Sequence, residues 1–288
     1  MADKPVMAGA VLSDDIADYP DGLVLVIDKP LRWTSADVIR KIKFAAIRHF
    51  HKKNLKVGHA GTLDPLAEGV LLVCIGAACK RAEEFQRHDK EYETDIVFGA
   101  TTPSYDLEKE PDRLFPCEHI DRGAVEAVLP SFIGEQMQVA PLFSAKSIDG
   151  VRAYELARKA LRNGEAVEDG LLRSSLIHIH SLELLRFGPY QPVSGNDDAT
   201  AGSAGTSKAS SRIHVSDTSA LAGNPCATLR VACSKGTYIR ALARDLGEAL
   251  NSGAFLSRLQ RTASGSFTLS DALSIEQALA LFTPAGSV

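Results

Sequence analysis

The chain lacks the features that would place it in an oxidising compartment or in a membrane. Its five cysteines are an odd number, and no pair has C-x-x-C spacing. This usage argues against a disulfide framework or a zinc site and favours buried, reduced thiols in a cytoplasmic protein. Residues 1–21 are rich in aspartate and do not resemble a signal peptide. No run approaches the roughly 20 apolar residues that a membrane-spanning helix needs.

A global positive charge is also missing. The 288 residues are 45% hydrophobic and 24% charged, with a net charge of −4, which is ordinary globular composition. A nucleic-acid partner would therefore have to be held by a local basic surface. The sequence contains no H-E-x-x-H, no Cys/His cluster, no P-loop pattern and no G-x-S-x-G elbow. It thus gives no support for a metal centre, a nucleotide-binding P-loop or a serine hydrolase.

Strands and helices are interspersed without regular βαβ alternation, which predicts an α+β fold with a mixed or mainly antiparallel sheet. The length suits one large domain or two small ones. Apolar or alternating runs predict strands at residues 22–28, 70–76, 91–99, 136–139, 176–187 and 227–232. Helical spacing and capping signals predict helices at residues 77–88, 122–132, 154–163 and 275–281, one that begins after Thr34, and one that begins at Tyr238.

The predicted helix after Thr34 has a strongly basic face. Thr34 and Asp37 resemble a capping box, and Val38, Ile42 and Phe50 have the spacing of a buried stripe. Seven basic residues lie on the other side and just beyond the helix: Arg40, Lys41, Lys43, Arg48, Lys52, Lys53 and Lys56. Such a face suits contact with the phosphates of a nucleic acid, although a solvated helix face has the same composition.

The stretch from Lys56 to Leu71 has an unusual composition. It holds three glycines, one proline, one histidine and two carboxylates, and it leads directly into an apolar strand. Gly58 and Gly61 suit backbone conformations that other residues resist, and Pro65 restricts the residue before it. We therefore expect a shaped loop that holds the Asp64 carboxylate in a set position, the kind of place where chemistry concentrates. An ordinary turn with a solvated aspartate is the alternative.

Five separated blocks resemble the bacterial tRNA pseudouridine-55 synthases. They occur in the family's order, cover residues 22 to about 282, and begin at Gly22, Gly58, Lys90, Cys233 and Leu259. The most specific are G-H-A-G-T-L-D-P-x3-G-V-L from Gly58 and C-S-K-G-T-Y-I-R-x3-R-D-L-G from Cys233. The block at Gly58 also occurs in guide-RNA-dependent relatives. Because their flanking extensions are missing here, the stand-alone type is favoured.

The resemblance implies the pseudouridine-synthase fold, in which helices and loops flank a central mixed, mostly antiparallel sheet and an active-site cleft crosses the middle. It also implies an isomerase that converts the T-loop uridine of tRNA to pseudouridine. The N1–ribose bond breaks, the base turns, and it is rejoined through C5. No net redox change or group transfer occurs, so no cofactor and no metal is expected. The implied partner is tRNA, bound at the T-loop and T-stem by a cytoplasmic monomer that needs no protein partner and no membrane.

By the family pattern, three residues carry the reaction. Asp64 is the nucleophile, which attacks either the ribose or the base. Arg240 pairs with Asp64 and keeps this carboxylate ionised in a desolvated site. Tyr92 stacks on the target base. We accordingly expect Asp64 to be buried and paired with arginine.

The remaining site residues are assigned to substrate binding. The target uridine lies in a folded loop and must be flipped out, and His59 matches the residue that fills the vacated space. Tyr238 and Leu259 match positions that contact or flank the base. Lys29 and Pro30 match a pair that supports the active-site loop. Thr62, in the same loop, is expected to be a further substrate contact.

The domain organisation is expected to be simple. Residues 1–21 are predicted to form a flexible tail and residues 22–284 the catalytic domain. Within that domain, residues 138–168 match the family's thumb-like RNA-binding segment. A low-complexity insertion spans about 191–224, and its residues 194–211 contain no large apolar side chain. The family's usual C-terminal PUA domain is expected to be absent.

Two other functions are compatible with the same sequence. One is a pseudouridine synthase that acts on a different RNA uridine, because pocket residues do not discriminate between target RNAs. The other is a non-catalytic RNA-binding or chaperone module on the same fold. The presence of Asp64, Tyr92 and Arg240 together argues against the second.

Overall fold

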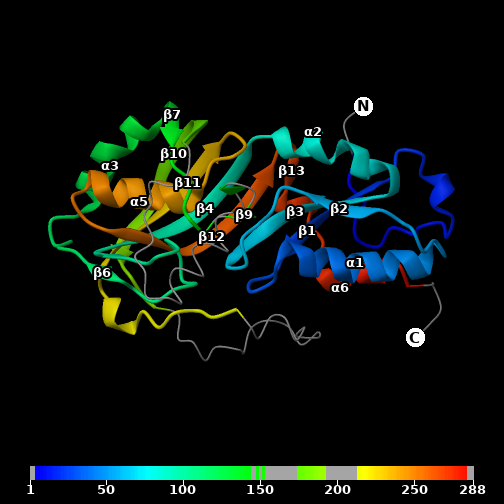
Figure 1. Cartoon of the computed structure of the whole chain (residues 1–288), viewed down its shortest axis with the longest axis horizontal. Helices are drawn as coiled ribbons and strands as arrows, with labels where there is room; N and C mark the ends of the chain where they lie inside the picture. The colour runs from blue at the N-terminus through cyan, green and yellow to red at the C-terminus, as the bar shows by residue number, and fades with distance from the viewer. Residues whose placement is uncertain (1–3, 144–146, 149–150, 153–173, 193–212, 284–288) are drawn as a thin grey trace. The chain divides into compact units, whose positions relative to one another are not determined.

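The computed structural model describes residues 4–143, 147–148, 151–152, 174–192 and 213–283. The chain divides into two compact units (Figure 1). Unit 1 comprises Met1–Glu91, Ser203–Ile213 and Gln260–Val288, and unit 2 comprises Tyr92–Gly202 and His214–Leu259. The chain passes from one unit to the other within the strands β4 (Lys90–Phe98) and β12 (Ala254–Ser264). Antiparallel strands interspersed with helices confirm the predicted α+β class.

Unit 1 is built on β1 (Leu23–Lys29) and β3 (Ala67–Ile75), which pair antiparallel from Leu23↔Ile75 to Lys29↔Gly69. On the other side of β3 lie β2 (Val57–Ala60) and the end of β12. The short β13 (Phe267–Thr268) pairs with β12. The continuous apolar runs of β1 and β3 predict strands buried on both faces, and these residues are indeed buried.

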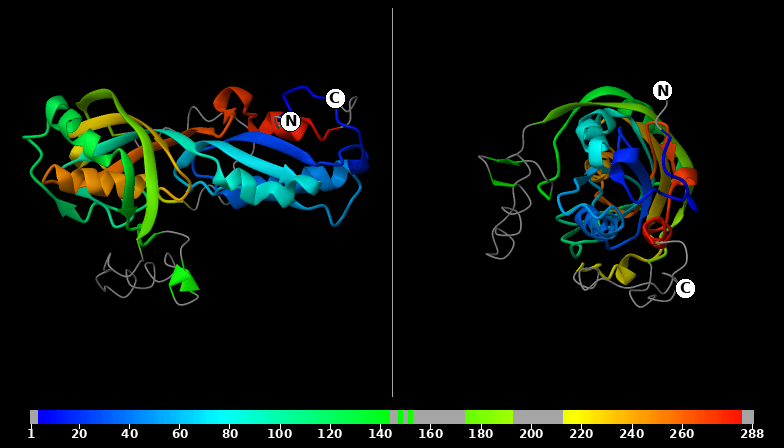
Figure 2. Two further views of the ribbon diagram at one scale, coloured as in Figure 1. Left: turned by 90° about the horizontal axis from the view of Figure 1, so that it is seen from above. Right: turned by 90° about the vertical axis from the view of Figure 1, so that its right-hand side faces the viewer.

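Helices cover both faces of these strands. α1 (Ser35–His49) and α6 (Ile275–Ala280) lie side by side on one face, and α2 (Ala82–Arg87) lies on the other (Figures 1 and 2). One core layer joins β1, β2, β3, β13 and α2 through Val24, Val26, Ala60, Val70, Leu72, Cys74, Ala78, Phe85 and Phe267. Because successive strand side chains alternate between faces, Leu25, Ile27 and Leu71 point to the opposite layer.

The predicted capping box starts α1. The Thr34 hydroxyl accepts a hydrogen bond from Asp37 N, and the Asp37 carboxylate accepts one from Thr34 N, both at 3.1 Å. Arg40 Nη1 lies 2.7 Å from Asp37 Oδ1. Burial raises the pKa of Asp37, but the hydrogen bonds from Thr34 and Arg40 outweigh this effect and bring the pKa below its ordinary value of 3.8.

Two helices differ from their predicted lengths. The stretch predicted as a helix at 77–88 is a 3-10 helix, η2 (Gly76–Arg81), followed by the short α2. The stretch 122–132 is α3 (Arg122–Val128) followed by another 3-10 helix, η3 (Leu129–Phe132). Pro130 explains the second break, because it lacks the backbone N–H that would continue the α-helical pattern.

Unit 2 contains the strand order β12–β4–β11–β10–β7, with β11 at Pro225–Cys233, β10 at Ser175–Pro189 and β7 at Gly134–Gln138. β10 is one long strand, as predicted, with register shifts at Ile179/Ser181 and Leu184/Arg186. α5 (Ile239–Ala249) follows β11 and begins one residue after the predicted start at Tyr238, which is its N-cap residue.

Short elements complete the described chain. β5 (Ala100–Thr101) and β6 (Arg113–Leu114) pair within a stretch whose polar composition predicts only a loop. The remaining ones are β8 (Ser147–Ile148), β9 (Val151–Arg152), η1 (Ile16–Asp18), η6 (Ser219–Leu221) and η7 (Leu269–Asp271). The predicted helix at 154–163 and the apolar-poor stretch 194–211 lie outside the described residues.

The segment predicted to be a flexible tail makes defined contacts from residue 4 onward. Val6 N donates to Val24 O at 3.0 Å, and His49 Nε2 donates to Ser13 O at 2.9 Å. Ser13 N donates to Tyr19 Oη at 2.7 Å. This segment therefore packs against β1 and α1, and its mobility stays a prediction. None of the helices in the described ranges is long and apolar enough to cross a bilayer.

The capping box yields a testable prediction. Asp37→Asn should lower the free energy of unfolding by about 1 kcal/mol at neutral pH, because it weakens the cap and the contact with Arg40. The pKa of Asp37 is lowered in the folded state, so its stabilisation is complete above the unfolded pKa and is lost as pH falls through the folded value. In urea denaturation, the difference in unfolding free energy between wild type and Asp37→Asn should be constant near neutral pH and should shrink below about pH 4. A difference in unfolding free energy that stays constant down to about pH 2 would contradict this prediction.

Candidate active site

Arg261 ties together the two ends of the loop that carries Asp64. The loop joins β2 to β3 within unit 1, and the Arg261 side chain is only 2% exposed. Its Nε donates to Val70 O at 2.7 Å, and its Nη2 donates to Gly61 O at 3.1 Å. Gly61 precedes Asp64 and Val70 follows it, so one planar guanidinium sets the distance between the two ends of the loop.

Two glycines make this arrangement possible. Gly61 and Gly69 have φ angles of +88° and +95°, which other residues resist. A Cβ at Gly69 would lie 2.2 Å from Arg261 O, so no side chain fits there. Gly58, predicted to need a special conformation, instead lies in β2 at a negative φ with open space around it. That part of the loop prediction was wrong. Gly69, and not Gly58, is the second glycine whose backbone conformation other residues resist.

The residues on either side of Asp64 are also fixed. Ser35 Oγ donates to Leu63 O at 3.2 Å and accepts from Leu63 N at 3.0 Å. Both residues are buried. Arg32 N donates to Pro65 O at 2.9 Å, and Ala67 N donates to Asp64 O at 3.1 Å. The backbone at Asp64 therefore has little freedom.

Lys29 lies at the base of the same loop. This fully buried residue donates from Nζ to Trp33 O at 2.7 Å, to Pro30 O at 2.8 Å and to Pro65 O at 3.4 Å. Burial lowers the pKa of Lys29 to about 8, against the opposing effect of the nearby Glu68 and Asp64 carboxylates. Its amine therefore carries a positive charge at neutral pH, and its contacts link β1 to the loop backbone.

The side chains that are predicted to face a substrate are more open. Asp64 is partly exposed, so the expectation of a buried carboxylate was wrong. Thr62 is exposed, and His59 is half-buried on β2. Burial, and then the Arg261 cation, lower the pKa of His59, so its imidazole is neutral at pH 7. Its buried Nδ1 has no hydrogen-bond partner among the described residues.

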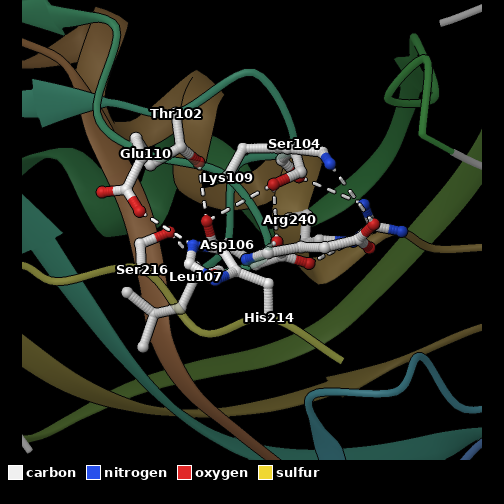
Figure 3. A network of polar contacts seen from close by, with 10 residues as sticks. Thr102, Ser104, Asp106, Leu107, Lys109, Glu110, His214, Ser216 and Arg240 are labelled. Carbon is white, nitrogen blue, oxygen red and sulfur yellow. Dashed lines mark hydrogen bonds and ion pairs between the residues drawn. The ribbon is translucent and has the colours of Figure 1, made fainter. Parts of the chain in front are cut away.

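Arg240 is the centre of a polar network in unit 2 (Figure 3). It is the second residue of α5 and is 4% exposed. Its Nη1 donates to Ser104 O at 3.1 Å and its Nη2 to Phe143 O at 2.9 Å, and its Nε lies 3.6 Å from Asp106 Oδ2. These contacts fix the plane of the guanidinium.

Asp106 is itself held in place by the loop around it. Its Oδ1 accepts from Ser104 Oγ at 2.6 Å and from Glu108 N at 2.9 Å, and its backbone carbonyl accepts from Thr102 Oγ1 at 2.7 Å. Asp106 is 7% exposed, and a buried carboxylate needs such partners. Sequence reasoning missed it, because the stretch 101–116 reads only as a polar loop.

A second chain segment joins the Asp106 loop (Figure 3). Ser216 donates to Leu107 O from its backbone N at 2.8 Å and from its Oγ at 2.9 Å. His214 Nε2 and Glu110 Oε1 are 2.8 Å apart. These residues fall at the end of the stretch predicted as the 191–224 insertion, so that part of the insertion packs on the loop that supports Arg240.

Tyr238 is the N-cap residue of α5 and is fixed by Gln138. The Gln138 amide donates to Tyr238 O at 3.1 Å and accepts from Tyr238 N at 2.9 Å. The tyrosine packs against a small cluster that includes Leu142 and Phe143. Phe143 in turn accepts the hydrogen bond from Arg240, so one segment orients both predicted site residues.

The structure thus sorts the predicted residues into two groups. Unit 1 holds Lys29, Pro30, His59, Thr62 and Asp64, and unit 2 holds Tyr92, Tyr238, Arg240 and Leu259. Tyr92 lies on β4 and is 9% exposed, whereas Leu259 on β12 is half-buried. The pairing of Asp64 with Arg240 and the stacking role of Tyr92 stay predictions. Ser35 and Arg261 were missed as supporting residues, although both fall within the sequence blocks that carry the family resemblance.

Known proteins resemble this chain over most of its length. Residues 48–194 match the family described as TruB family pseudouridylate synthase (N terminal domain). A protein named tRNA pseudouridine synthase B from Phocaeicola vulgatus is 47% identical over 90% of this chain and 92% of its own length. A protein of the same name from Parabacteroides distasonis is 45% identical, over 90% of this chain and 93% of its own.

Solved structures share the fold at lower identity. A chain of the archaeal box H/ACA sRNP Nop10–Cbf5 complex superposes with a TM-score of 0.54 at 20% identity. A chain of a Cbf5–Nop10–Gar1 complex has a TM-score of 0.57 at 23% identity. Each match covers 91% of this chain and 54% of the other, so the chain spans about half the length of these structural neighbours.

The close approach at Gly69 can be tested with a matched pair of variants. Gly69→Ala should lower the free energy of unfolding by about 2–4 kcal/mol, because its Cβ would collide with the Arg261 backbone and its φ is positive. Gly58→Ala should change it by less than about 0.5 kcal/mol, because the space around Gly58 is open. Urea denaturation measures both. Equal effects of the two substitutions would show that the contact with Arg261 does not constrain the loop.

Proposed function

Because the chain belongs to the TruB family of pseudouridylate synthases, we propose that it is a tRNA pseudouridine synthase that isomerises the T-loop uridine at position 55. The observation that carries this proposal is its 47% identity, over 90% of its length, to a protein named tRNA pseudouridine synthase B. The rigidly held loop around Asp64 supports it, because covalent catalysis needs a positioned nucleophile.

The proposed reaction rearranges one nucleotide without adding or removing atoms. The bond from N1 to ribose C1′ breaks, and a bond from C5 to C1′ forms. The proton on C5 is lost to solvent, and N1 gains one. The Asp64 carboxylate acts as the nucleophile, either at ribose C1′ or at the base, and is released when the new bond is complete.

The cations of unit 1 support this role for Asp64. The charges of Lys29 and Asp64 interact, and Lys29 donates to Pro65 O beside the carboxylate. Arg261 adds a second positive charge at the ends of the same loop. Both cations attract the negative carboxylate that the proposal makes the nucleophile, and so help to hold it in place.

In the proposal, residues of unit 2 complete the chemistry. Arg240 pairs with Asp64 during the reaction, and Tyr92 stacks on the base. The contacts of Arg240 with Ser104, Phe143 and Asp106 support its role, because a guanidinium that is already oriented loses little entropy when it binds a carboxylate.

His59 suits the space that the flipped uridine leaves. Its imidazole is neutral at pH 7, so it enters a stack of bases without needing a counter-ion. Flipping costs a few kcal/mol of lost stacking, which such a replacement offsets in part.

Tritium release tests the proposed function. A tRNA transcript labelled with tritium at C5 of uridine is incubated with wild type, with Asp64→Asn, and with Asp21→Asn as a matched control on the exposed surface. Wild type and Asp21→Asn should release tritium from one T-loop position at equal rates. Asp64→Asn should be slower by roughly 10³-fold or more, since an amide is not a nucleophile.

Each contrary outcome has its own meaning. Release by Asp64→Asn at the wild-type rate would refute the nucleophile assignment. Release by wild type only from a uridine outside the T-loop would refute the substrate but keep the reaction. Failure of wild type to release tritium from any RNA, while still binding it, would favour a non-catalytic RNA-binding module.

A further inference from the structure

A basic hollow opens in unit 1 at the start of β2, away from the Asp64 loop. Its volume is about 520 Å³, and it is lined by Lys43, Lys53, Asn54, Leu55, Lys56, Val57, Gly58 and Cys79. β2 runs from the hollow toward the loop, and its residues Val57–Ala60 span roughly 10 Å at about 3.3 Å per residue. None of the lining residues has a role in the proposed chemistry.

Three separate elements bring positive charge to the basic hollow. Lys43 lies on the exposed face of α1, Lys53 in the turn after it, and Lys56 directly before β2. All three are exposed, and no carboxylate of the described chain lies within 4.0 Å of their amines. Among the residues that the structure describes, the lining contains no Asp or Glu, although the whole chain has a net charge of −4. The positive charge is therefore concentrated at this place.

The inner surface of the hollow adds hydrogen-bond donors but no negative charge. The Asn54 side chain offers an amide. The space beside Gly58 is open, because no atom lies within 4 Å of the position that a Cβ would take there. Burial raises the pKa of the Cys79 thiol above 9.0, against the smaller effects of the Gly58 N–H and the Lys56 charge. The thiol is thus neutral at physiological pH, and the net charge of the lining is that of its three lysines.

We propose that the basic hollow binds backbone phosphates of the RNA substrate, outside the loop that enters the active site. This inference rests on the proposed function for its choice of RNA. Lysine ammonium groups without protein partners bind phosphates as point charges, and three of them around one open concavity suit a sugar–phosphate backbone. The described part of the lining has no aromatic side chain on which a nucleobase could stack. An RNA that places a uridine at Asp64 extends well beyond 10 Å, so its helical stem can reach this end of β2.

Charge-removing variants test the proposal. In Lys53→Gln/Lys56→Gln the hollow loses two of its three charges, and Lys4→Gln/Arg113→Gln is the matched control. Its two cations are also exposed, but they lie outside both the basic face of α1 and the lining of the hollow. The affinity for a fluorescent tRNA is measured by anisotropy across a series of KCl concentrations.

The two double variants should differ clearly. For the hollow variant, the slope of log Kd against log[KCl] should become shallower by about 1 to 2, and Kd near physiological salt should rise roughly 10-fold. For the control variant, Kd should stay within about twofold of wild type. The rate of tritium release at saturating tRNA should be unchanged in both, so the loss appears in KM and not in kcat. Equal slopes and equal KM values for the two variants would overturn the proposal.

The alkylation rate of Cys79, which lines the hollow, gives an independent test of whether tRNA occupies it. Alkylation of Cys79 by iodoacetamide is followed by peptide mass spectrometry, with the partly exposed Cys117 of unit 2 as an internal reference. Saturating tRNA should slow the alkylation of Cys79 severalfold relative to Cys117. No selective protection by tRNA would contradict the proposal. Equal protection by millimolar inorganic phosphate would identify a site for small anions and would also contradict it.

Failure of this proposal can be told apart from failure of the proposed function. If wild type releases tritium from the T-loop but the hollow variant behaves like its control, the function stands and the hollow is not a phosphate site. If wild type releases none, the proposed function fails. In that case, protection of Cys79 by tRNA would still show that RNA occupies the basic hollow. A lack of protection would refute that occupancy as well.

Discussion

The hydrogen bonds from Arg261 to Gly61 O and Val70 O are the constraint on which the active-site loop depends. They connect two positions on opposite sides of Asp64 through one buried, planar group. Gly69 must be glycine because the Arg261 backbone approaches it too closely for any side chain. One side chain of β12 therefore constrains both ends of the loop, and the contacts of Ser35, Lys29 and Arg32 with the loop backbone complete its shape.

Burial of a guanidinium costs desolvation free energy, which hydrogen bonds to carbonyl oxygens and interactions of its charge with other groups must offset. Here burial lowers the pKa of both His59 and Lys29, and the Arg261 charge lowers each further while it adds to the positive surroundings of the Asp64 loop. The neutral imidazole and the cations around the Asp64 loop suit the proposed mechanism, in which a ring enters the RNA and a carboxylate attacks. The basic hollow at the far end of β2 extends the same positive character toward the phosphates of a stem. One short strand thus connects the proposed chemistry to the proposed RNA contact.

Local signals in the sequence predicted most elements of the fold. The capping box of Thr34 and Asp37 gave the start of α1, and apolar runs gave β1 and β3, because these features depend on neighbouring residues. The motifs supplied the candidate site residues, such as Asp64 and Arg240, and one support of the loop, Lys29, but they did not supply Arg261 or Asp106. Arg261 is nearly 200 positions from the loop that it holds, and Asp106 lies in a stretch without periodicity, so neither contact follows from local pattern. The misplaced emphasis on Gly58 has the same cause, since the close approach that requires a glycine comes from a distant strand.

The most direct test of this account is the single-turnover rate of an Arg261→Lys variant. Lysine keeps the charge but cannot bond to both carbonyls with a fixed plane. The account predicts a rate of tritium release at saturating tRNA that falls by roughly 100-fold, since small displacements of a nucleophile have effects of this size. The affinity for tRNA should stay within about twofold of that of Arg186→Lys, a control at an exposed arginine. A single-turnover rate equal to that of the control, in a protein of unchanged fold, would contradict the claim that Arg261 positions Asp64.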